Sequence, residues 1–322
     1  MNKLTRRGFF YGAGSMCLSA SASASPHVKP LTFDENKTIV LADIHVAYPK
    51  LITPRGGQPD YPNAFFSRAA NQILAMRPLP RRVVVLGDIS LWFGYRKDYE
   101  IARPVIDRLK AAGIQVYLVP GNHDHRNPMS QVFPEYMENS PVKGSLTSVV
   151  DIGSSDFYLL DTLHEQTIEE GAQNPGGGML SAEQGKWLAD AAKNAKRPFI
   201  VAAHHPIEDL LYEDKPLLDY LAKTKFYSGF IHGHLHRWNV KWTVGVKVEC
   251  PLTRAVSIPS AGLWGDIGFA VLETKNDHAK ITNVQTDFFY PRPRENGEAR
   301  PKEWDFIVKE NNAQTCLFNY RG

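Results

Sequence analysis

Between Thr38 and His45 the chain reads TIVLADIH. The first five of these residues are apolar or β-branched, which predicts a buried strand over residues 38–42. Asp43 and His45 follow at the carboxyl end of this strand, two residues apart, and both side chains can bind a metal ion. The segment therefore predicts a strand that delivers two potential metal ligands to its end.

Four further predicted strands end in the same way. Residues 82–86 precede Asp88, residues 114–119 precede Asn122, residues 199–203 precede His204, and residues 226–231 precede His234 and His236. In open α/β sheets, ligands bind outside the carboxyl ends of the strands, so these five ends can converge although they span about 190 residues. We expect one site built from all of them.

The patterns D-x-H, G-D, G-N-H-D, H-H-P and G-H-x-H follow one another from Asp43 to His236. In this order and strand context, the chain resembles the calcineurin-like metallophosphoesterase superfamily. The resemblance implies an α/β fold in which two mixed β-sheets form a sandwich flanked by helices. It also implies a metal-dependent phosphoric ester hydrolase, either a phosphomonoesterase or a phosphodiesterase, that acts on a small-molecule phosphate ester.

The resemblance also implies a ligand set. One metal would be held by Asp43, His45 and His236, a second by Asn122, His204 and His234, and Asp88 would bridge the two. Independently of the family, carboxylate, imidazole and amide ligands favour Mn, Fe, Zn or Co over thiophilic ions. Two such ions about 3.5 to 4 Å apart stabilise both the attacking and the leaving oxygen of an in-line displacement. We therefore expect two metal ions as cofactors, with a bridging hydroxide as the nucleophile.

Two residues beside Asn122 are expected to take part in catalysis. His123 cannot easily be a ligand next to Asn122, so we expect it to donate to a phosphoryl or leaving-group oxygen, as the matching histidine does in the family. Asp124 is expected to fix the tautomer and orientation of His123. His205 and His232 adjoin ligands, and we expect them to support the site or pack beside it, with direct involvement of either left open.

The charge distribution bears on the class of partner. The formal net charge of +3 arises from Lys3, Arg6 and Arg7, and the remaining chain has 34 basic and 34 acidic side chains. Because the rest of the chain has no net charge, we expect no general affinity for nucleic acid or an anionic membrane. A metal-dependent nuclease, which normally needs a basic surface, and a non-catalytic metal-binding scaffold are the alternatives. The complete ligand set argues against the scaffold.

The N-terminal segment resembles an export signal. Residues 5–10 read TRRGFF, which resembles the twin-arginine motif, and residues 20–24 form an A-x-A type cleavage region. The apolar stretch between them is shorter than the roughly 20 residues that a spanning helix needs. We predict a signal peptide over residues 1–24 that engages the twin-arginine export machinery, and residence in the periplasm or outside the cell. The alternative is an N-terminus without a targeting role.

The remaining pattern completes an α/β domain. Helices are predicted at 63–76, 98–112, 181–192 and 216–222, and strands at 238–244, 247–250, 255–259, 269–273 and 280–289. We expect one domain over residues 25–322, mostly β from about residue 238. Cys250 and Cys316 could pair in an oxidising compartment, which the sequence leaves open.

Three loops are expected to form the walls of the site, at residues 90–99, 126–143 and 162–179. The first contains Trp92, Phe93, Tyr95 and Arg96. These side chains could stack on and pair with a phosphorylated aromatic or nucleoside group, or pack onto the body of the domain.

Overall fold

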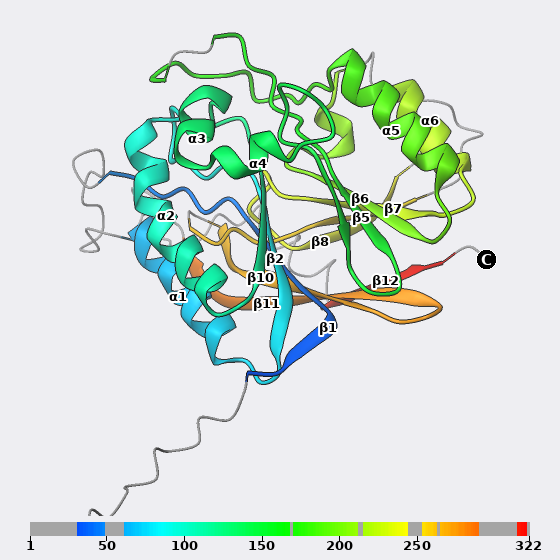
Figure 1. Ribbon diagram of the computed structural model, residues 1–322, viewed down its shortest axis with the longest axis horizontal. Coiled ribbons are helices and arrows are strands. Elements are labelled where there is room, and N and C mark those ends of the chain that lie inside the picture. Colours follow the sequence, from blue (N-terminus) through cyan, green and yellow to red (C-terminus); the bar gives the residue numbers. More distant parts are fainter. Residues whose placement is uncertain are drawn as a thin grey trace, which may run out of the picture. The chain divides into compact units, whose positions relative to one another are not determined.

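Two six-stranded sheets form the framework of the protein (Figure 1). The computed structural model describes residues 31–48, 61–167, 170–211, 215–243, 253–262, 265–289 and 314–320. From Thr32 onward, the chain forms one compact unit.

The first sheet has the strand order β12-β11-β10-β1-β2-β3. Its strands are β1 (Phe33–Ala42), β2 (Leu79–Leu86), β3 (Gln115–Val119), β10 (Gly265–Thr274), β11 (His278–Phe289) and β12 (Thr315–Asn319). β1, β2 and β3 pair in parallel, whereas β10, β11 and β12 are joined by antiparallel pairing. The parallel part brings the carboxyl ends of β1, β2 and β3 to one edge.

The second sheet has the strand order β4-β5-β6-β7-β9-β8. Its strands are β4 (Ser148–Asp151), β5 (Asp156–Leu159), β6 (Phe199–Ala203), β7 (Tyr227–His232), β8 (Asn239–Thr243) and β9 (Thr253–Ser257). The central strands β5, β6, β7 and β9 are parallel, and β4 and β8 are antiparallel to their neighbours. The carboxyl ends of β6 and β7 therefore also lie together.

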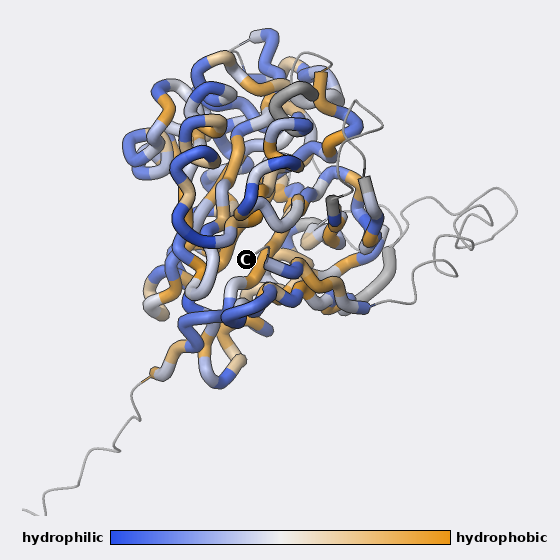
Figure 2. Tube along the Cα trace, turned by 90° about the vertical axis from the view of Figure 1, so that its right-hand side faces the viewer, coloured by the Kyte–Doolittle hydropathy of each residue, from blue (hydrophilic) through white to orange (hydrophobic). Residues whose placement is uncertain are grey.

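Helices cover the outer face of each sheet. They are α1 (Tyr61–Ala75), α2 (Arg96–Ala111), α3 (Arg126–Val132), α4 (Pro134–Glu138), α5 (Ala182–Asn194), α6 (Lys215–Lys223) and the 3-10 helix η2 (Ile207–Asp209). Figure 1 shows α1 and α2 on one side of the sheets, and α5 and α6 on the other. In Figure 2 hydrophilic and hydrophobic residues alternate along the helices, as expected when one face of a helix is buried.

Alternating side chains of β1 supply two different cores. Ile39 and Leu41 belong to the apolar cluster that β1, β2 and β3 share with α1 and α2. Val40 and Ala42 belong to the cluster between the two sheets, together with β6 and β7. Because successive strand residues point to opposite faces, one apolar run fills both layers. The expected sandwich of two mixed sheets flanked by helices is confirmed.

Several elements differ from the sequence expectation. β1 begins at Phe33, five residues before the predicted start, and the short strands β4, β5 and β12 were not predicted. Residues 126–143, expected to be a loop, include the helices α3 and α4. The strand predicted at 247–250 lies outside the described residues.

Cys316 is buried in β12. Cys250 lies outside the described residues, so a disulfide between the two cysteines stays a prediction. Among the described residues, we find no helix with the length and apolar character that a membrane crossing requires.

Candidate metal centre

Backbone hydrogen bonds join the strand ends that precede the predicted ligands. The N–H of Asp43 donates to the carbonyl of Gly87 (3.0 Å), and the N–H of His45 donates to the carbonyl of Asp88 (2.9 Å). From the other sheet, the N–H of His234 donates to both carboxylate oxygens of Asp43, at 3.1 and 3.0 Å. The carboxyl ends of β1, β2 and β7 therefore meet at one place.

The predicted ligands have an unusual backbone conformation. Asp43, His45, Asp88, His234 and His236 have φ angles between 43° and 67°, and no other non-glycine residue in the described ranges has a positive φ. The left-handed conformation costs an L-residue roughly 1–2 kcal/mol. Strain of this kind clusters at functional sites, where the surrounding structure enforces it. The chain thus bends sharply as it leaves β1, β2 and β7 and aims side chains into the site.

Four of the predicted ligands form one buried group. The Nε2 atom of His45 lies 3.1 Å from Nε2 of His236. It also lies 3.7 Å from Oδ2 of Asp88 and 4.0 Å from Oδ1 of Asp43. Nε2 of His236 is 3.3 Å from Oδ1 of Asp43. One ligand atom from each of the four residues lies within 4.8 Å of the others, which suits a single metal ion.

The second group is centred on Nε2 of His204. This atom lies 3.3 Å from Oδ2 of Asp88, 3.1 Å from Oδ1 of Asn122 and 3.2 Å from Nδ1 of His234. Oδ2 of Asp88 therefore faces both His204 and His45, as a bridging carboxylate must. The structure brings all seven predicted ligands into one continuous cluster.

The hydrogen bonds of two histidines fix which ring nitrogen of each faces the cluster. Nδ1 of His204 is 2.9 Å from the carbonyl of Leu86, and Nδ1 of His45 is 3.1 Å from the carbonyl of Leu91. A carbonyl only accepts, so each Nδ1 carries a proton, and in the neutral form of either ring the lone pair of Nε2 points into the cluster. Within the cluster, each of these lone pairs faces lone pairs of other nitrogen or oxygen atoms. The lone pairs repel one another unless a cation lies between them. Two ligands about 2.1 Å from one ion lie roughly 3.0 to 3.4 Å apart, close to the separations around His204.

The pKa values describe the same electrostatic environment. Burial lowers the pKa of His45 to about 3 and that of His234 to about 4, so both rings are neutral at ordinary pH. At His204 burial opposes the charge, but the Asp88 carboxylate outweighs it and raises the pKa to about 9. Burial would raise the pKa of Asp88, yet His204 and His123 hold it well below its usual range. The cluster thus favours ionised carboxylates, neutral rings at His45 and His234, and a positive charge at His204, and a bound metal cation would take the place of the proton on His204.

His123 lies beside the cluster, but Asp124 does not orient it. Nε2 of His123 is 3.9 Å from Oδ2 of Asp88, while its Nδ1 is 3.0 Å from the carbonyl of Trp92. The Asp124 carboxylate instead accepts bonds from the N–H groups of Ile89, Ser90 and Gly121, at 2.9 to 3.1 Å. The expected role of Asp124 toward His123 is therefore wrong, because the side chain turns back to tie the ends of β2 and β3 together. The Trp92 carbonyl takes that role.

His205 lies closer to the second group than its sequence position suggested. A ring nitrogen of His205 lies within 4.8 Å of ligand atoms of His204 and His234. Its Nδ1 is 2.8 Å from Oγ1 of Thr162, whereas its Nε2 is buried without a hydrogen-bond partner. An unsatisfied buried polar atom costs roughly 1–3 kcal/mol, so this atom is expected to gain a partner when the site is filled. His232 is also buried but belongs to neither group.

The segment at 162–179 borders the site, and sequence reasoning missed the residue that attaches it. The side-chain amide of Asn174 donates to the carbonyls of Asn122 and Asp124, at 3.3 and 2.9 Å. No motif marks Asn174, because its partners are backbone atoms about 50 residues earlier.

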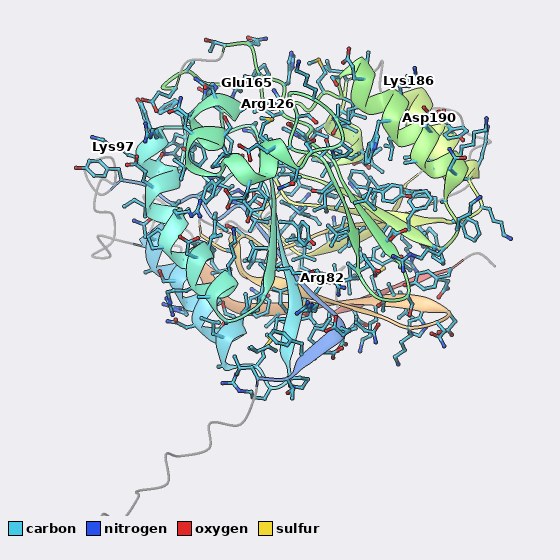
Figure 3. All side chains as sticks on the ribbon, in the orientation of Figure 1. Arg82, Lys97, Arg126, Glu165, Lys186 and Asp190 are labelled. Atoms are coloured by element: carbon cyan, nitrogen blue, oxygen red, sulfur yellow. The ribbon has the colours of Figure 1, made fainter. Side chains whose placement is uncertain are left out.

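A charged cluster anchors the beginning of the same segment. The guanidinium of Arg126 pairs with Asp161 at 2.8 Å. It also pairs with Glu165 at 3.1 Å, and Figure 3 labels these two residues. Nδ1 of His125 lies 3.0 Å from the Glu165 carboxylate, and its Nε2 lies 3.0 Å from the carbonyl of Ala172. These contacts hold Asp161, Glu165 and Ala172 next to the turn that contains Asn122 and His123.

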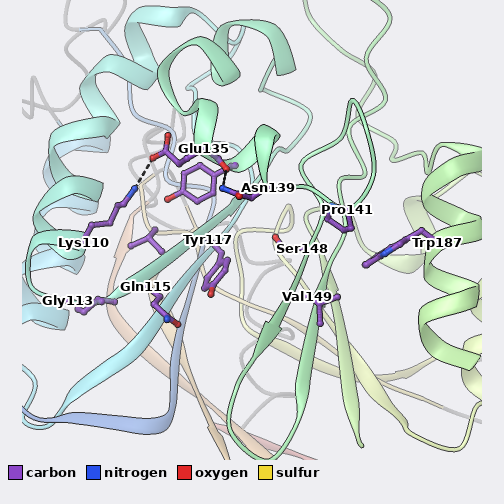
Figure 4. Close-up of a pocket in the computed structure, with 13 residues that line it drawn as sticks. Lys110, Gly113, Gln115, Tyr117, Glu135, Asn139, Pro141, Ser148, Val149 and Trp187 are labelled. Carbon is purple, nitrogen blue, oxygen red and sulfur yellow. Dashed lines mark hydrogen bonds and ion pairs between the residues drawn. The ribbon is translucent and has the colours of Figure 1, made fainter. Parts of the chain in front are cut away.

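A cavity of about 730 Å³ lies elsewhere, where β3 and β4 border it (Figure 4). Its lining includes Lys110 of α2, Glu135 of α4 and Trp187 of α5, and the Lys110 and Glu135 side chains form an ion pair at 2.8 Å. None of the predicted ligands lines it. Residues of α4, expected to wall the metal site, face this separate cavity.

Comparison with known families agrees with the geometry. The family model described as calcineurin-like phosphoesterase matches residues 37–238, from β1 to beyond the last predicted ligand. The chain belongs to this family. The calcineurin-like phosphoesterase is also similar in fold to a dimetal phosphatase from Danio rerio, with a TM-score of 0.58 and 14% identity, over 91% of this chain and 100% of the other.

Two curated relatives match this calcineurin-like phosphoesterase at low identity. One is a probable cyclic nucleotide phosphodiesterase of Coxiella burnetii, 24% identical over 212 residues, covering 62% of this chain and 75% of the relative. The other is a probable glycerophosphodiester phosphodiesterase of Arcobacter nitrofigilis, 26% identical over 183 residues, covering 51% of this chain and 61% of the relative. The protein is a metal-dependent phosphoric ester hydrolase, with a buried group of Asp and His residues that can bind metal.

Proposed function

We propose that the protein hydrolyses phosphodiesters at a dinuclear metal centre. Asp43, His45 and His236 hold one ion, Asn122, His204 and His234 hold the other, and Asp88 bridges them. One observation carries the proposal: Nε2 of His204 lies 3.1 to 3.3 Å from three other potential ligand atoms while its Nδ1 is committed to a carbonyl. Mn, Fe, Zn or Co suits this mixture of ligands. Both curated relatives have phosphodiesterase names, which supports diesters as the substrates.

The residues around the ions have separate tasks in this proposal. When bound, two divalent cations stabilise charge on the phosphoryl oxygens and make water acidic enough to attack at neutral pH. His123 directs Nε2 toward the cluster because its Nδ1 is held by the Trp92 carbonyl. In its protonated form, His123 donates to the oxygen of the leaving group. The backbone N–H of His123 donates to Oδ1 of Asp88 at 2.9 Å, which couples its position to the bridging carboxylate.

Hydrolysis by the Mn-loaded protein tests the proposal. Bis(4-nitrophenyl) phosphate and 4-nitrophenyl phosphate distinguish a diesterase from a monoesterase. We expect Asp88→Asn to lose bound metal and activity together. His123→Ala should keep its metal and lose about 10²- to 10⁴-fold in kcat, the range for general acid–base catalysis. His278→Ala is a matched control, since His278 lies on β11 and bonds to Asp277. Wild-type protein that binds two ions and does not hydrolyse the diester would refute the proposal.

We also propose that residues 1–24 direct the folded protein to the twin-arginine export machinery. These residues lie outside the described part of the chain, and the support is the TRRGFF motif and the A-x-A region. Replacing Arg6 and Arg7 by lysine should keep the protein in the cytoplasm with residues 1–24 attached. Cell fractionation with mass spectrometry of the N-terminus measures this, and unchanged export of the variant would contradict the proposal.

A further inference from the structure

Trp92 is an exposed aromatic residue beside the metal cluster. Its ring centroid lies 5.2 Å from that of His123, in an edge-to-face arrangement, and 6.4 Å from that of His45. The side chain nevertheless remains 43% exposed. Ligand pockets are lined mainly by hydrophobic and aromatic side chains, so an indole beside the cluster is suited to contact a ligand. The ring lies on the side of the cluster that contains His45 and His123.

The backbone around Trp92 is held in place. The carbonyl of Trp92 bonds to Nδ1 of His123 at 3.0 Å, and the N–H of Gly94 donates to Oγ of Ser90 at 3.0 Å. The carbonyl of Phe93 accepts from the N–H of Gly171 at 2.8 Å. Because the main chain is fixed on both sides of the indole, a ligand that packs against the ring has little ordering entropy to overcome.

The neighbouring side chains have other partners. The rings of Phe93 and Tyr95 contact each other at a centroid distance of 6.1 Å. The guanidinium of Arg96 pairs with Glu100 at 3.0 Å. Of the four side chains considered from the sequence, only Trp92 has its ring against rings of the site, within the described part of the chain.

We propose that Trp92 packs against the esterified group of the substrate and selects phosphate esters that carry an aromatic ring close to the phosphate. This inference rests on the proposed function, since it places the leaving group beside His123. Indole stacks offset or edge-to-face with aromatic rings, which matches a flat group better than an alkyl chain. A quaternary ammonium group also binds to indole, but the cations of the filled site repel a positive charge here.

Binding of phosphonates tests this without hydrolysis, because their P–C bond resists cleavage. Calorimetry on the Mn-loaded protein compares phenylphosphonate, methylphosphonate and a trimethylammonium-ethyl phosphonate. We expect wild type to bind the phenyl compound about tenfold more tightly than the methyl compound, and Trp92→Ala to bind them equally. Trp92→Phe should retain most of the preference. Trp242→Ala is the control, because Trp242 is 55% exposed on the edge strand β8 and lies over Arg254.

Metal content and the melting temperature of each variant confirm an intact site. An unchanged phenyl preference in a folded, metal-loaded Trp92→Ala protein would overturn the inference. Tightest binding of the ammonium compound by wild type would overturn it as well. Both results come from binding measurements and do not depend on turnover. They count against the role of Trp92, whereas a wild-type protein that hydrolyses no ester would count against the proposed function itself.

Discussion

A methyl group added at Gly121 probes the geometry of the site directly. In Gly121→Ala the new Cβ would lie 2.2 Å from Oδ1 of Asp88, 2.5 Å from its backbone N and 2.8 Å from Nδ1 of His204. Carbon atoms approach other heavy atoms to about 3.2 Å or more, so the Asp88 carboxylate or the Gly121 turn must move by about 1 Å. The turn cannot move freely, since the N–H of Gly121 is bonded to Asp124 at 2.9 Å.

The size of the effect follows from this displacement. A misplacement of about 1 Å at a catalytic centre costs about 100-fold in rate, which corresponds to about 2.7 kcal/mol of transition-state stabilisation. Disturbing the groups that support metal ligands lowers metal affinity by about 10- to 100-fold. Overpacking of a dense region costs roughly 1–3 kcal/mol of folding stability, which lowers the melting temperature by several degrees.

The assay measures bound metal, kcat/KM for bis(4-nitrophenyl) phosphate and the melting temperature. The matched control is Gly176→Ala, because a Cβ at Gly176 would meet nothing within 4 Å. We expect bound metal, kcat/KM and the melting temperature all to be lower in Gly121→Ala than in wild type. In Gly176→Ala all three should match wild type. If Gly121→Ala bound two ions with wild-type affinity and kept kcat/KM within about threefold, the close approach of Gly121 to Asp88 would have no functional meaning, and our reasoning would be wrong.

Three further experiments test the bound metal, His205 and His125 in turn. Removal of metal with EDTA should lower the melting temperature, since a ligand present at about 100 times its Kd stabilises the folded state by about 2.7 kcal/mol; equal melting curves for chelated and Mn-loaded protein would contradict a metal site. His205→Ala should weaken the binding of one of the two ions by about 10-fold or more, measured by titration against a competing chelator. Unchanged affinity for both ions would show that Nε2 of His205 has no part in metal binding. Burial opposes protonation of His125, but its bonds to Glu165 and Ala172 prevail and raise its pKa. Its stabilising contribution is therefore complete below the ordinary pKa of about 6.5 and is lost as the pH rises through the raised folded-state pKa. In urea unfolding the free-energy difference between wild type and His125→Gln should shrink as the pH rises, and a pH-independent difference would exclude this role.

The parts of the fold that could be predicted are those with a strong local signal. Residues 39–42 and 83–86 are continuous apolar runs because both faces of β1 and β2 are buried, and such runs are visible without a structure. The candidate ligands were found because each lies within five residues of the end of a predicted strand. The start of the helix predicted at 181–192 is equally local, because the Ser181 side chain accepts from the N–H of Gln184 at 3.1 Å.

The parts that could not be predicted depend on distant partners. β5 has four residues, Asp156–Leu159, too few to show a period, and it is specified by pairing with β6. His125 had no identifiable partner in the sequence because Glu165 is 40 residues away. Adjacency suggested that Asp124 orients His123, but neighbouring side chains of a tight turn point in different directions. The carbonyl of Trp92 cannot be chosen from sequence, since every residue has one.

The strained backbone at the strand ends links folding to function. Five left-handed residues at roughly 1–2 kcal/mol each amount to about 5–10 kcal/mol, comparable with the whole net stability of a typical domain. Such a conformation persists only if other interactions enforce it. Here the N–H groups of Asp43 and His45 continue the pairing of β1 with β2, and that of His234 bonds to the Asp43 carboxylate. The bonds that offset the strain are thus made by the same residues that supply the ligands. A substitution that weakens the pairing of β1 with β2 should therefore release Asp43 and His45 together, so metal binding is expected to fail before the sheet itself unfolds.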